Sequence, residues 1–224
     1  MYVPERTLVV APHPDDDVLG AGATMAKLAA AGGEVVVAIV SRAQPPRFSA
    51  EFGEAGVREA HDAHKLLGVS RTIVLDFPIA ELDHIPHADV NAALLSIFEE
   101  VRPEAVFLPF GGDLFMDHQR VSLSSIVCAR PVTPFAPTAV YCYETLSQTN
   151  WNAPYAAQFT PTAFTDVADH LETKLAAMSC FTSQLKAFPH ERSLEAIRSL
   201  ATLRGARFGC AAAEAFVGVR QRLF

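Results

Sequence analysis

The stretch TLVVAPHPDDDVLG (residues 7–20) places an apolar run directly before one imidazole and three carboxylates. Residues 8–11 are apolar at every position, which is typical of a β-strand buried on both faces. The segment from Val18 to about Ala31 has the composition of a helix, and Gly32-Gly33 is a natural stop. Carboxylates at a helix start are stabilised by the helix dipole and can cap its free N–H groups. The stretch therefore predicts a strand, a polar turn and a helix in direct succession.

The same alternation of strand and helix continues through the chain. Further strands are expected at residues 34–40, 71–76, 104–109, 138–143 and 164–167, and helices at 55–67, 89–101, 119–130, 168–181 and 193–207. Segments 41–53 and 78–87 are expected to be loops, and no linker or repeat divides the chain. The pattern predicts an α/β fold, namely a single Rossmann-like, doubly wound, mostly parallel sheet with helices on both faces, in one domain over residues 1–224.

The amino-acid composition argues against nucleic acid and against a membrane span. The chain has 224 residues, is 50% hydrophobic and carries a net charge of -7 without a basic run, so nucleic acid is not an expected partner. No apolar run approaches the roughly 18 residues of a membrane span, and the N-terminus lacks the features of a signal peptide. The four cysteines show no CxxC spacing and are expected to be buried free thiols, which favours a cytoplasmic location.

A second polar cluster, GGDLFMDH (residues 111–118), follows the strand expected at 104–109. Ligands of such sheets bind outside the carboxyl ends of the strands, so both clusters are expected at one edge. His13, Asp16 and His118 could then meet at one metal ion, because two imidazoles and a carboxylate with a fourth position for water form a catalytic zinc arrangement. Asp15 would be free to act as a general base toward that water.

Two other interpretations of these clusters stay open at this point. The three aspartates can serve only as a cap for the helix that follows them. Alternatively they can hold magnesium for phosphoryl or sugar transfer, although His13 and His118 count against magnesium, which prefers oxygen ligands.

The segment APHPDDDVLG (residues 11–20) resembles the signature of the PIG-L/LmbE-like zinc deacetylases, usually written AHPDDExLG, and residues 112–118 resemble the second motif of that family, which ends in Asp-His. Similarity extends over nearly the whole chain, including YET (143–145), KLAA (174–177), PHERS (189–193) and AEAF (213–216). The resemblance implies that His13, Asp16 and His118 bind one zinc ion per chain and that Asp15 is the base. It implies hydrolysis of the N-acetyl group of an N-acetylglucosamine-type amino-sugar conjugate, and a possible homo-oligomer.

The sequence departs from the family pattern at two positions. Asp17 stands where most members have Glu, and its supporting role is expected to survive the shorter side chain. Phe115 stands where many members have a histidine that steadies the oxyanion or protonates the leaving amine, and Phe can do neither. His190 or Arg192 are candidates to assist the oxyanion instead. Two rival functions therefore accompany the deacetylase: a metal-dependent sugar or nucleotide-sugar transferase, and a non-catalytic sugar-binding homologue.

Further polar residues are candidates for the surroundings of the site. Asp117 and Asp113 are expected to orient the ligand imidazoles or to contact sugar hydroxyls, with helix capping as the alternative for Asp117. Arg58 is a candidate for substrate binding, with an exposed ion pair as the alternative. His61 and His64 have the spacing of a metal pair, but a solvated helix face is favoured because no third ligand is apparent.

Two aromatic side chains are further candidates. Trp151 and Tyr155 lie in a loop and could stack on a sugar or simply pack on the surface.

Overall fold

The computed structural model describes residues 3–151 and 153–222. Its strands form one seven-stranded sheet in the order β3-β2-β1-β4-β5-β7-β6. The strands are β1 (Arg6–Ala11), β2 (Glu34–Arg42), β3 (Arg71–Pro78), β4 (Ala105–Pro109), β5 (Ala139–Tyr143), β6 (Ala163–Asp166) and β7 (Ala213–Gln221). The first five run parallel, whereas β7 is antiparallel to both β5 and β6, so the predicted mostly parallel α/β sheet is confirmed.

Strand β7 has no counterpart among the strands predicted from the sequence. It inserts between β5 and β6 and pairs Tyr143 with Phe216 and Phe164 with Ala215. The first four residues of β7 are buried, whereas the last five are partly or fully exposed. Strand β1, by contrast, is buried along almost its whole length. Pairing with two neighbours, rather than its own hydrophobic pattern, makes this segment a strand.

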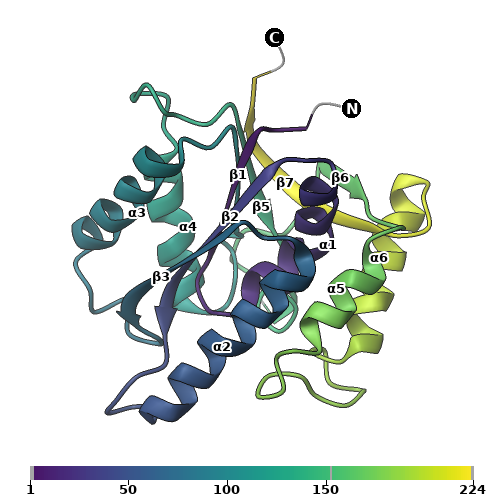
Figure 1. Cartoon of the computed structure of the whole chain (residues 1–224), viewed down its shortest axis with the longest axis horizontal. Helices are drawn as coiled ribbons and strands as arrows, with labels where there is room; N and C mark the ends of the chain where they lie inside the picture. The colour runs from purple at the N-terminus through teal and green to yellow at the C-terminus, as the bar shows by residue number, and fades with distance from the viewer. Residues whose placement is uncertain (1–2, 152, 223–224) are drawn as a thin grey trace.

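Helices cover both faces of the sheet (Figure 1). They are α1 (Asp16–Ala30), α2 (Ala50–Leu67), α3 (His87–Val101), α4 (Met116–Cys128), α5 (Leu171–Met178) and α6 (Leu194–Phe208). Alternate residues of β1 enter opposite cores: Val9 packs with residues of α1, α2, α5 and α6, whereas Leu8 packs with residues of α3 and α4. A strand buried on both faces explains why residues 8–11 are apolar throughout.

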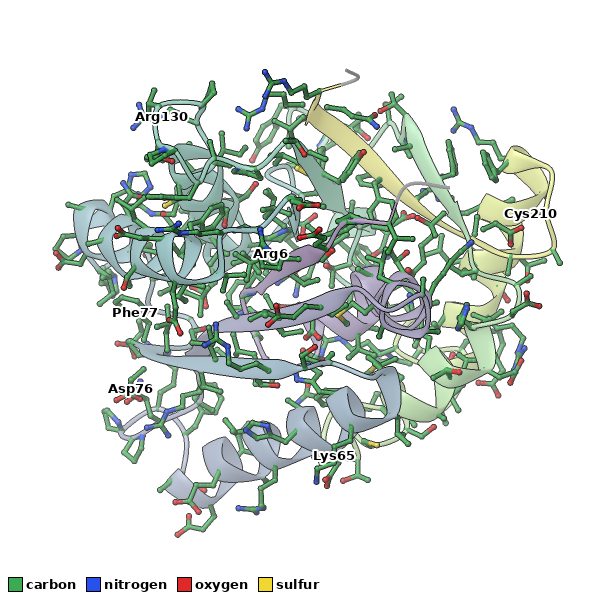
Figure 2. All side chains as sticks on the ribbon, turned by 45° about the horizontal axis from the view of Figure 1, so that its top comes forward. Arg6, Lys65, Asp76, Phe77, Arg130 and Cys210 are labelled. Atoms are coloured by element: carbon green, nitrogen blue, oxygen red, sulfur yellow. The ribbon has the colours of Figure 1, made fainter. Side chains whose placement is uncertain are left out.

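Charged side chains lie on the surface, and the cysteines differ in how deeply they are buried. Labelled charged side chains such as Lys65 and Arg130 lie at the periphery of the molecule (Figure 2). Cys128 and Cys142 are buried free thiols as predicted, whereas the free thiols of Cys180 and Cys210 are only partly buried. Among the described residues, no helix combines the length and the apolar composition needed to cross a bilayer.

The order of the strands decides where the site lies. β1 has β2 on one side and β4 on the other, with Val9 opposite both Val37 and Phe107. The chain connections therefore run in opposite directions from β1, which leaves a crevice at the carboxyl ends of β1 and β4. The turn after β1 begins at Pro12 and the loop after β4 begins at Phe110, so both polar clusters lie at this crevice.

Helix α1, which begins at the end of this turn, is not continuous as predicted. Ala21 has the non-helical angles φ -137° and ψ 15°, and the helix is broken there. The ammonium of Lys174 donates to the carbonyl oxygen of Leu19 at 2.8 Å, before the break. The N–H groups of Ala23 and Thr24, after the break, donate to the carboxylate of Glu214 at 3.1 and 2.7 Å. Side chains from α5 and β7 thus replace backbone hydrogen bonds that the break removes.

Candidate metal centre and active site

Three predicted metal ligands, His13, Asp16 and His118, converge at the crevice. One potential ligand atom from each lies within 4.8 Å of the others, and all three residues are buried. Asp16 Oδ2 is 2.9 Å from His13 Nδ1 and 3.1 Å from His118 Nε2. The backbone N–H of His13 also donates to Asp16 Oδ2 at 2.9 Å, which holds the turn in this shape.

The donor set fits a divalent metal ion. Asp16 Oδ1 is buried and has no hydrogen-bond partner among the described residues, and buried His118 Nε2 makes no well-directed hydrogen bond there, although Asp16 Oδ2 lies 3.1 Å away. Buried polar atoms normally have a partner, so two such atoms on neighbouring side chains indicate a binding site for a cation. Two imidazole nitrogens and one carboxylate match zinc better than magnesium, which prefers oxygen alone.

Each imidazole also contacts a carboxylate with its other nitrogen. Asp117 Oδ2 lies 3.0 Å from His13 Nε2, and Asp113 Oδ2 lies 2.8 Å from His118 Nδ1. Asp117 accepts hydrogen bonds from the backbone N–H groups of Ala80 and Leu82 at 2.7 and 3.2 Å. Such carboxylates fix which nitrogen carries the proton and how each ring is oriented.

These contacts decide between the alternatives for Asp113 and Asp117. Asp113 is fully buried and binds His118 and the hydroxyl of Thr149, which donates to it at 2.6 Å, so Asp113 does not contact sugar hydroxyls. Asp117 lies in the first turn of α4, but the N-cap of that helix is Phe115, which makes no side-chain capping bond. Both aspartate side chains therefore contact imidazoles in this structure.

The electrostatics of the metal-free cluster centre on Asp16. Burial lowers the pKa of His118, but the carboxylates of Asp16 and Asp113 outweigh this and raise it to about 10. Burial alone would raise the pKa of Asp16, but His118 and His13 lower it far below its usual range. A protonated His118 would therefore stabilise the buried carboxylate of Asp16 electrostatically.

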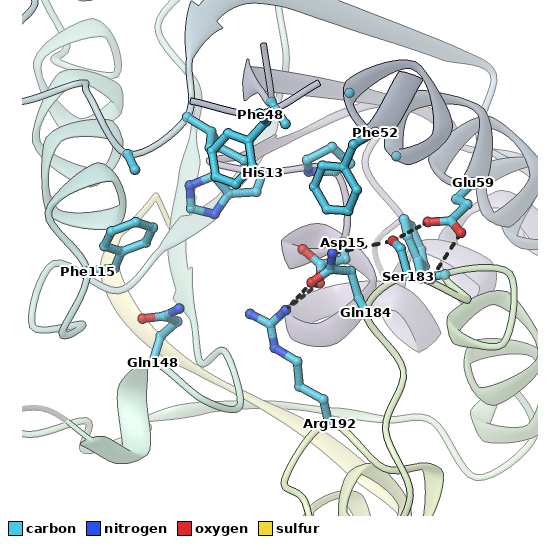
Figure 3. A pocket seen from close by; sticks show the side chains of 17 residues that line it. His13, Asp15, Phe48, Phe52, Glu59, Phe115, Gln148, Ser183, Gln184 and Arg192 are labelled. Atoms are coloured by element: carbon cyan, nitrogen blue, oxygen red, sulfur yellow. Dashed lines mark hydrogen bonds and ion pairs between the residues drawn. The ribbon is translucent and has the colours of Figure 1, made fainter. Parts of the chain in front are cut away.

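Asp15, the predicted base, faces the cavity beside the cluster. Its Oδ2 accepts from Arg192 Nη1 at 3.0 Å (Figure 3). Burial, together with the neighbouring Asp16, raises the pKa of Asp15 above its usual value, although Arg192 and His13 partly offset this. Arg192 is fixed in turn, because its Nη1 donates to Gln184 at 2.9 Å and its Nε donates to the hydroxyl of Ser147 at 2.7 Å.

The cavity itself has a volume of about 290 Å³ and is bordered by His13, Asp15 and Arg192. Arg58 lies outside it: the side chain is 67% exposed and pairs with Glu54 at 3.7 Å, as in the alternative interpretation. His190 is exposed and its Nδ1 accepts the backbone N–H of Arg192 at 3.0 Å, so it supports that loop and does not face the cavity.

The two aromatic candidates do not border this cavity either. The indole N–H of Trp151 donates to Glu191 at 2.7 Å, and Tyr155 is 94% exposed.

Asp17 contacts His64, a residue whose predicted position on a solvated helix face was wrong. His64 was expected on a solvated helix face with His61, but only His61 is exposed. His64 is buried, with its Nε2 2.8 Å from Asp17 Oδ2 and its Nδ1 2.7 Å from the hydroxyl of Thr72. This chain of contacts joins the first turn of α1 to α2 and β3, and it gives the shorter Asp17 a partner within reach.

Several cavity residues were missed in the sequence. Phe48 and Phe52 border the cavity from the start of α2, in a segment that was predicted to be a loop up to residue 53. The helix begins earlier, at Ala50, because the hydroxyl of Ser49 caps it by accepting from the N–H of Phe52 at 3.2 Å. Ser49, with the acidic Glu51 two residues later in the first turn, was the available signal for this helix start. Gln148 carried no such signal, since it lies in an irregular segment.

Comparison with known proteins finds a matching protein family. Residues 8–128 match the family model PIG-L, described as GlcNAc-PI de-N-acetylase. YaiS from Escherichia coli (strain K12), named an uncharacterised deacetylase, is 29% identical over 181 residues, which cover 76% of this chain and 87% of that protein.

Several solved structures share the fold, including a deacetylase and a hydratase. The N,N'-diacetylchitobiose deacetylase from Pyrococcus horikoshii has a TM-score of 0.78 and 22% identity, covering 96% of this chain and 84% of its own. The 4-carboxy-2-hydroxymuconate hydratase GalB from Pseudomonas putida KT2440 has a TM-score of 0.79 and 22% identity, covering 98% of both chains. At this level of identity the structures establish the fold alone, and one fold serves more than one reaction. The family match covers more than half of the 224 residues and contains both polar clusters, so this protein belongs to the PIG-L family of de-N-acetylases, and the N-deacetylase class predicted from its motifs is supported.

Proposed function

We propose that this chain is a zinc-dependent N-deacetylase that removes the acetyl group from an N-acetylglucosamine-type conjugate. The observation that carries the proposal is the convergence of His13, Asp16 and His118 beside a cavity that also contains Asp15. The family description, GlcNAc-PI de-N-acetylase, supports the substrate class.

His13 Nδ1, Asp16 and His118 Nε2 would hold one zinc ion, with Asp117 and Asp113 behind the two imidazoles. Zinc bound there would lower the pKa of a coordinated water to about 7 and polarise the amide carbonyl. Asp17 supports the same turn through His64.

Asp15 is the proposed general base. It lies one residue before Asp16 and borders the cavity, so its carboxylate would face an amide bound there without being part of the three-atom cluster. Arg192 favours the ionised carboxylate that a base requires. Asp15 would take a proton from water as water attacks the carbonyl carbon, and would return it to the nitrogen as the C–N bond breaks. Acetate and a free amine are the products.

Arg192 is the proposed partner of the carbonyl oxygen. Phe115 borders the cavity where many family members have a histidine, and its ring has no proton to give. Among the described cavity residues, Arg192 is the only lysine or arginine, and three hydrogen bonds hold its guanidinium in place. A fixed cation near a developing oxyanion is a standard source of transition-state stabilisation.

The test combines metal content with release of acetate. Purified protein should contain about one zinc per chain and release acetate from N-acetylglucosamine conjugates. Asp15→Asn should retain the zinc and lower kcat by at least about 100-fold, since it removes the base. Asp62→Asn, which changes a carboxylate that is 63% exposed on α2, is the matched control and should keep full activity.

Three results would contradict the proposal in different ways. Undiminished turnover by Asp15→Asn would remove the base assignment. Dependence on magnesium with transfer of a sugar would favour a transferase. Zinc binding without acetate release from any N-acetylhexosamine donor would favour a non-catalytic sugar-binding protein.

A further inference from the structure

A second cavity lies at the opposite end of the sheet from the metal cluster. Its lining includes Ala105 and Ala139, the first residues of β4 and β5, whereas the metal cluster lies beyond the carboxyl ends of β1 and β4. The volume is about 400 Å³, and none of its described lining residues borders the cavity beside Asp15. Figure 1 shows this end of the molecule, where the later turns of α1 lie beside β6 and β7. A molecule bound here would therefore not contact the proposed reacting groups.

Aromatic side chains form much of the wall of this second cavity. Phe107, Tyr141 and Phe216 contact one another, with ring centroids 4.9 to 6.4 Å apart. Phe164 and Phe208 form a stacked pair whose ring centroids are 5.4 Å apart, and Phe208 is 51% exposed. Sites for small molecules commonly have this volume, with mainly apolar and aromatic walls and a few polar groups that fix orientation.

Thr24 brings a buried hydroxyl without a partner to this wall. The residue borders the cavity and is 2% exposed, and its Oγ1 makes no hydrogen bond with any described residue. In a continuous helix, a threonine hydroxyl can donate to the carbonyl three or four residues earlier, but the break at Ala21 lies in that turn. Because a buried polar group without a partner costs free energy, this hydroxyl points to a ligand that supplies an acceptor.

Lys27 adds a positive charge beside Thr24. The two residues are three positions apart on α1, so their side chains lie on the same helix face. Lys27 Nζ donates to the carbonyl oxygen of Asp166 at 2.6 Å, at the end of the strand β6 that carries Phe164. An ammonium group has three N–H donors, so this bond leaves it able to bind an anion as well. A cationic donor thus lies close to the aromatic wall.

The remaining polar groups of the wall also favour an anion. Arg222 is a second cation in the lining. Among the described lining residues Asp166 is the only carboxylate, and its Oδ1 accepts the backbone N–H of Ala168 at 3.1 Å. Burial raises the pKa of the Tyr141 phenol, so this hydroxyl stays protonated at neutral pH and can donate. The cavity therefore combines aromatic rings with hydrogen-bond donors and an excess of positive charge.

We infer that this cavity binds a small aromatic carboxylate, whose ring packs against Tyr141 and Phe164 and whose carboxylate is bound by Thr24 and Lys27. An aromatic ring gains contacts with the rings of the wall, and a carboxylate supplies the acceptor that Thr24 lacks. A neutral or a saturated molecule matches only one of these two features. The inference does not depend on the proposed deacetylase function, because the cavity contains none of the metal-centre residues.

The test is calorimetric titration of the full-length, zinc-loaded protein with 2-naphthoate. This compound should bind at one site per chain with a Kd below about 1 mM. 2-Naphthamide keeps the rings but loses the charge, and it should bind at least about tenfold more weakly. Decahydro-2-naphthoate keeps the charge but loses the aromatic rings, and it should bind at least about threefold more weakly.

Variants assign the binding to the two donors on α1. Lys27→Met should weaken 2-naphthoate by at least about tenfold and leave the affinity for 2-naphthamide unchanged. Thr24→Val removes the hydroxyl with little change of shape and should weaken 2-naphthoate by about threefold or more. Because that hydroxyl has no partner among the described residues, Thr24→Val should not lower the urea midpoint of the ligand-free protein. Lys65→Met removes the same charge from an exposed side chain of α2 and should leave the affinity unchanged.

Binding at the proposed zinc site must be distinguished, because zinc also binds carboxylates. Removal of zinc with a chelator, and separately His118→Ala, should leave the affinity for 2-naphthoate unchanged. A loss of binding after chelation would place the ligand on the metal and overturn the inference. Absence of binding, equal affinities for the three compounds, or wild-type affinity in both Lys27→Met and Thr24→Val would overturn it as well. No arm measures release of acetate, so each of these results leaves the deacetylase proposal in place.

Discussion

The buried ammonium of Lys174 lies 2.6 Å from the carboxylate of Glu214, and together the two side chains bind the backbone on both sides of the break in α1. Lys174 supplies a donor to the carbonyl of Leu19, and Glu214 supplies acceptors to the N–H groups of Ala23 and Thr24. The ion pair thus fixes the first turn of α1, which carries Asp16, relative to α5 and β7.

Removing one member of this pair should destabilise the whole fold. Lys174→Met leaves Glu214 buried without its counter-charge, and it should lower the free energy of unfolding by about 3–5 kcal/mol. Urea denaturation of the metal-free protein measures this. Lys65→Met changes a lysine that is 76% exposed and should shift stability by less than about 0.5 kcal/mol. A loss below about 1 kcal/mol for Lys174→Met would show that the pair contributes little.

Metal affinity should separate a ligand from the carboxylate behind it. His118→Ala removes a proposed ligand and should abolish stoichiometric zinc binding. Asp113→Asn keeps the ligand but weakens the acceptor on His118 Nδ1, so zinc affinity should fall by about 10–100-fold. Competition with a chelator measures both. Wild-type affinity in Asp113→Asn would mean that the orientation of His118 does not depend on that carboxylate.

The pairing of Arg192 with Asp15 predicts a change in the pH profile. Arg192 lowers the pKa of Asp15, and the base works only when ionised, so activity should be lost as pH falls through that pKa. Arg192→Gln should move the acid limb of kcat/KM to higher pH by about one unit or more, in addition to lowering the rate.

Arg58→Gln is the matched control for this experiment. It removes the same charge from a side chain outside the cavity, and it should leave both the acid limb of the kcat/KM profile and the value of kcat/KM unchanged. An acid limb that stays in place in Arg192→Gln would show that Asp15 is not the group that titrates.

Zinc binding should release protons at neutral pH. The pKa of His118 is raised to about 10 in the metal-free fold, so its imidazole is protonated there and must lose that proton to bind zinc. Apparent affinity should therefore rise between about pH 6.5 and about pH 8.5, by up to about tenfold per unit for each proton displaced. Calorimetry in buffers with different heats of ionisation counts the protons, and a pH-independent affinity would contradict the raised pKa.

The same pKa sets a pH dependence of stability. Because the folded value of about 10 lies above the ordinary 6.5, the contribution of the charged His118 to the metal-free fold is fully present below about pH 6.5. It is lost as pH rises through about 10, and zinc should remove this dependence. Thermal unfolding with and without a chelator measures the difference.

Local sequence signals predicted the elements that lie close to the site. The apolar run before His13 and the helix after Asp17 are both present, because burial on both faces and helix-start chemistry act within a few residues. The break at Ala21 was not predictable in this way, since it depends on Lys174 and Glu214, which are more than 150 residues away along the chain.

What the sequence by itself determined is the chemistry available: two imidazoles and a carboxylate for a metal, Asp15 beside them, and strands whose carboxyl ends share one edge. Only the tertiary structure decided which group each side chain meets. In the fold, Asp17 contacts His64, His13 contacts Asp117, and Asp15 contacts Arg192. The side chains of Phe48, Phe52 and Phe115 border the same cavity. The reason is physical: propensity and periodicity act over neighbouring residues, whereas these contacts depend on strand order and on the packing of helices that are distant in the chain.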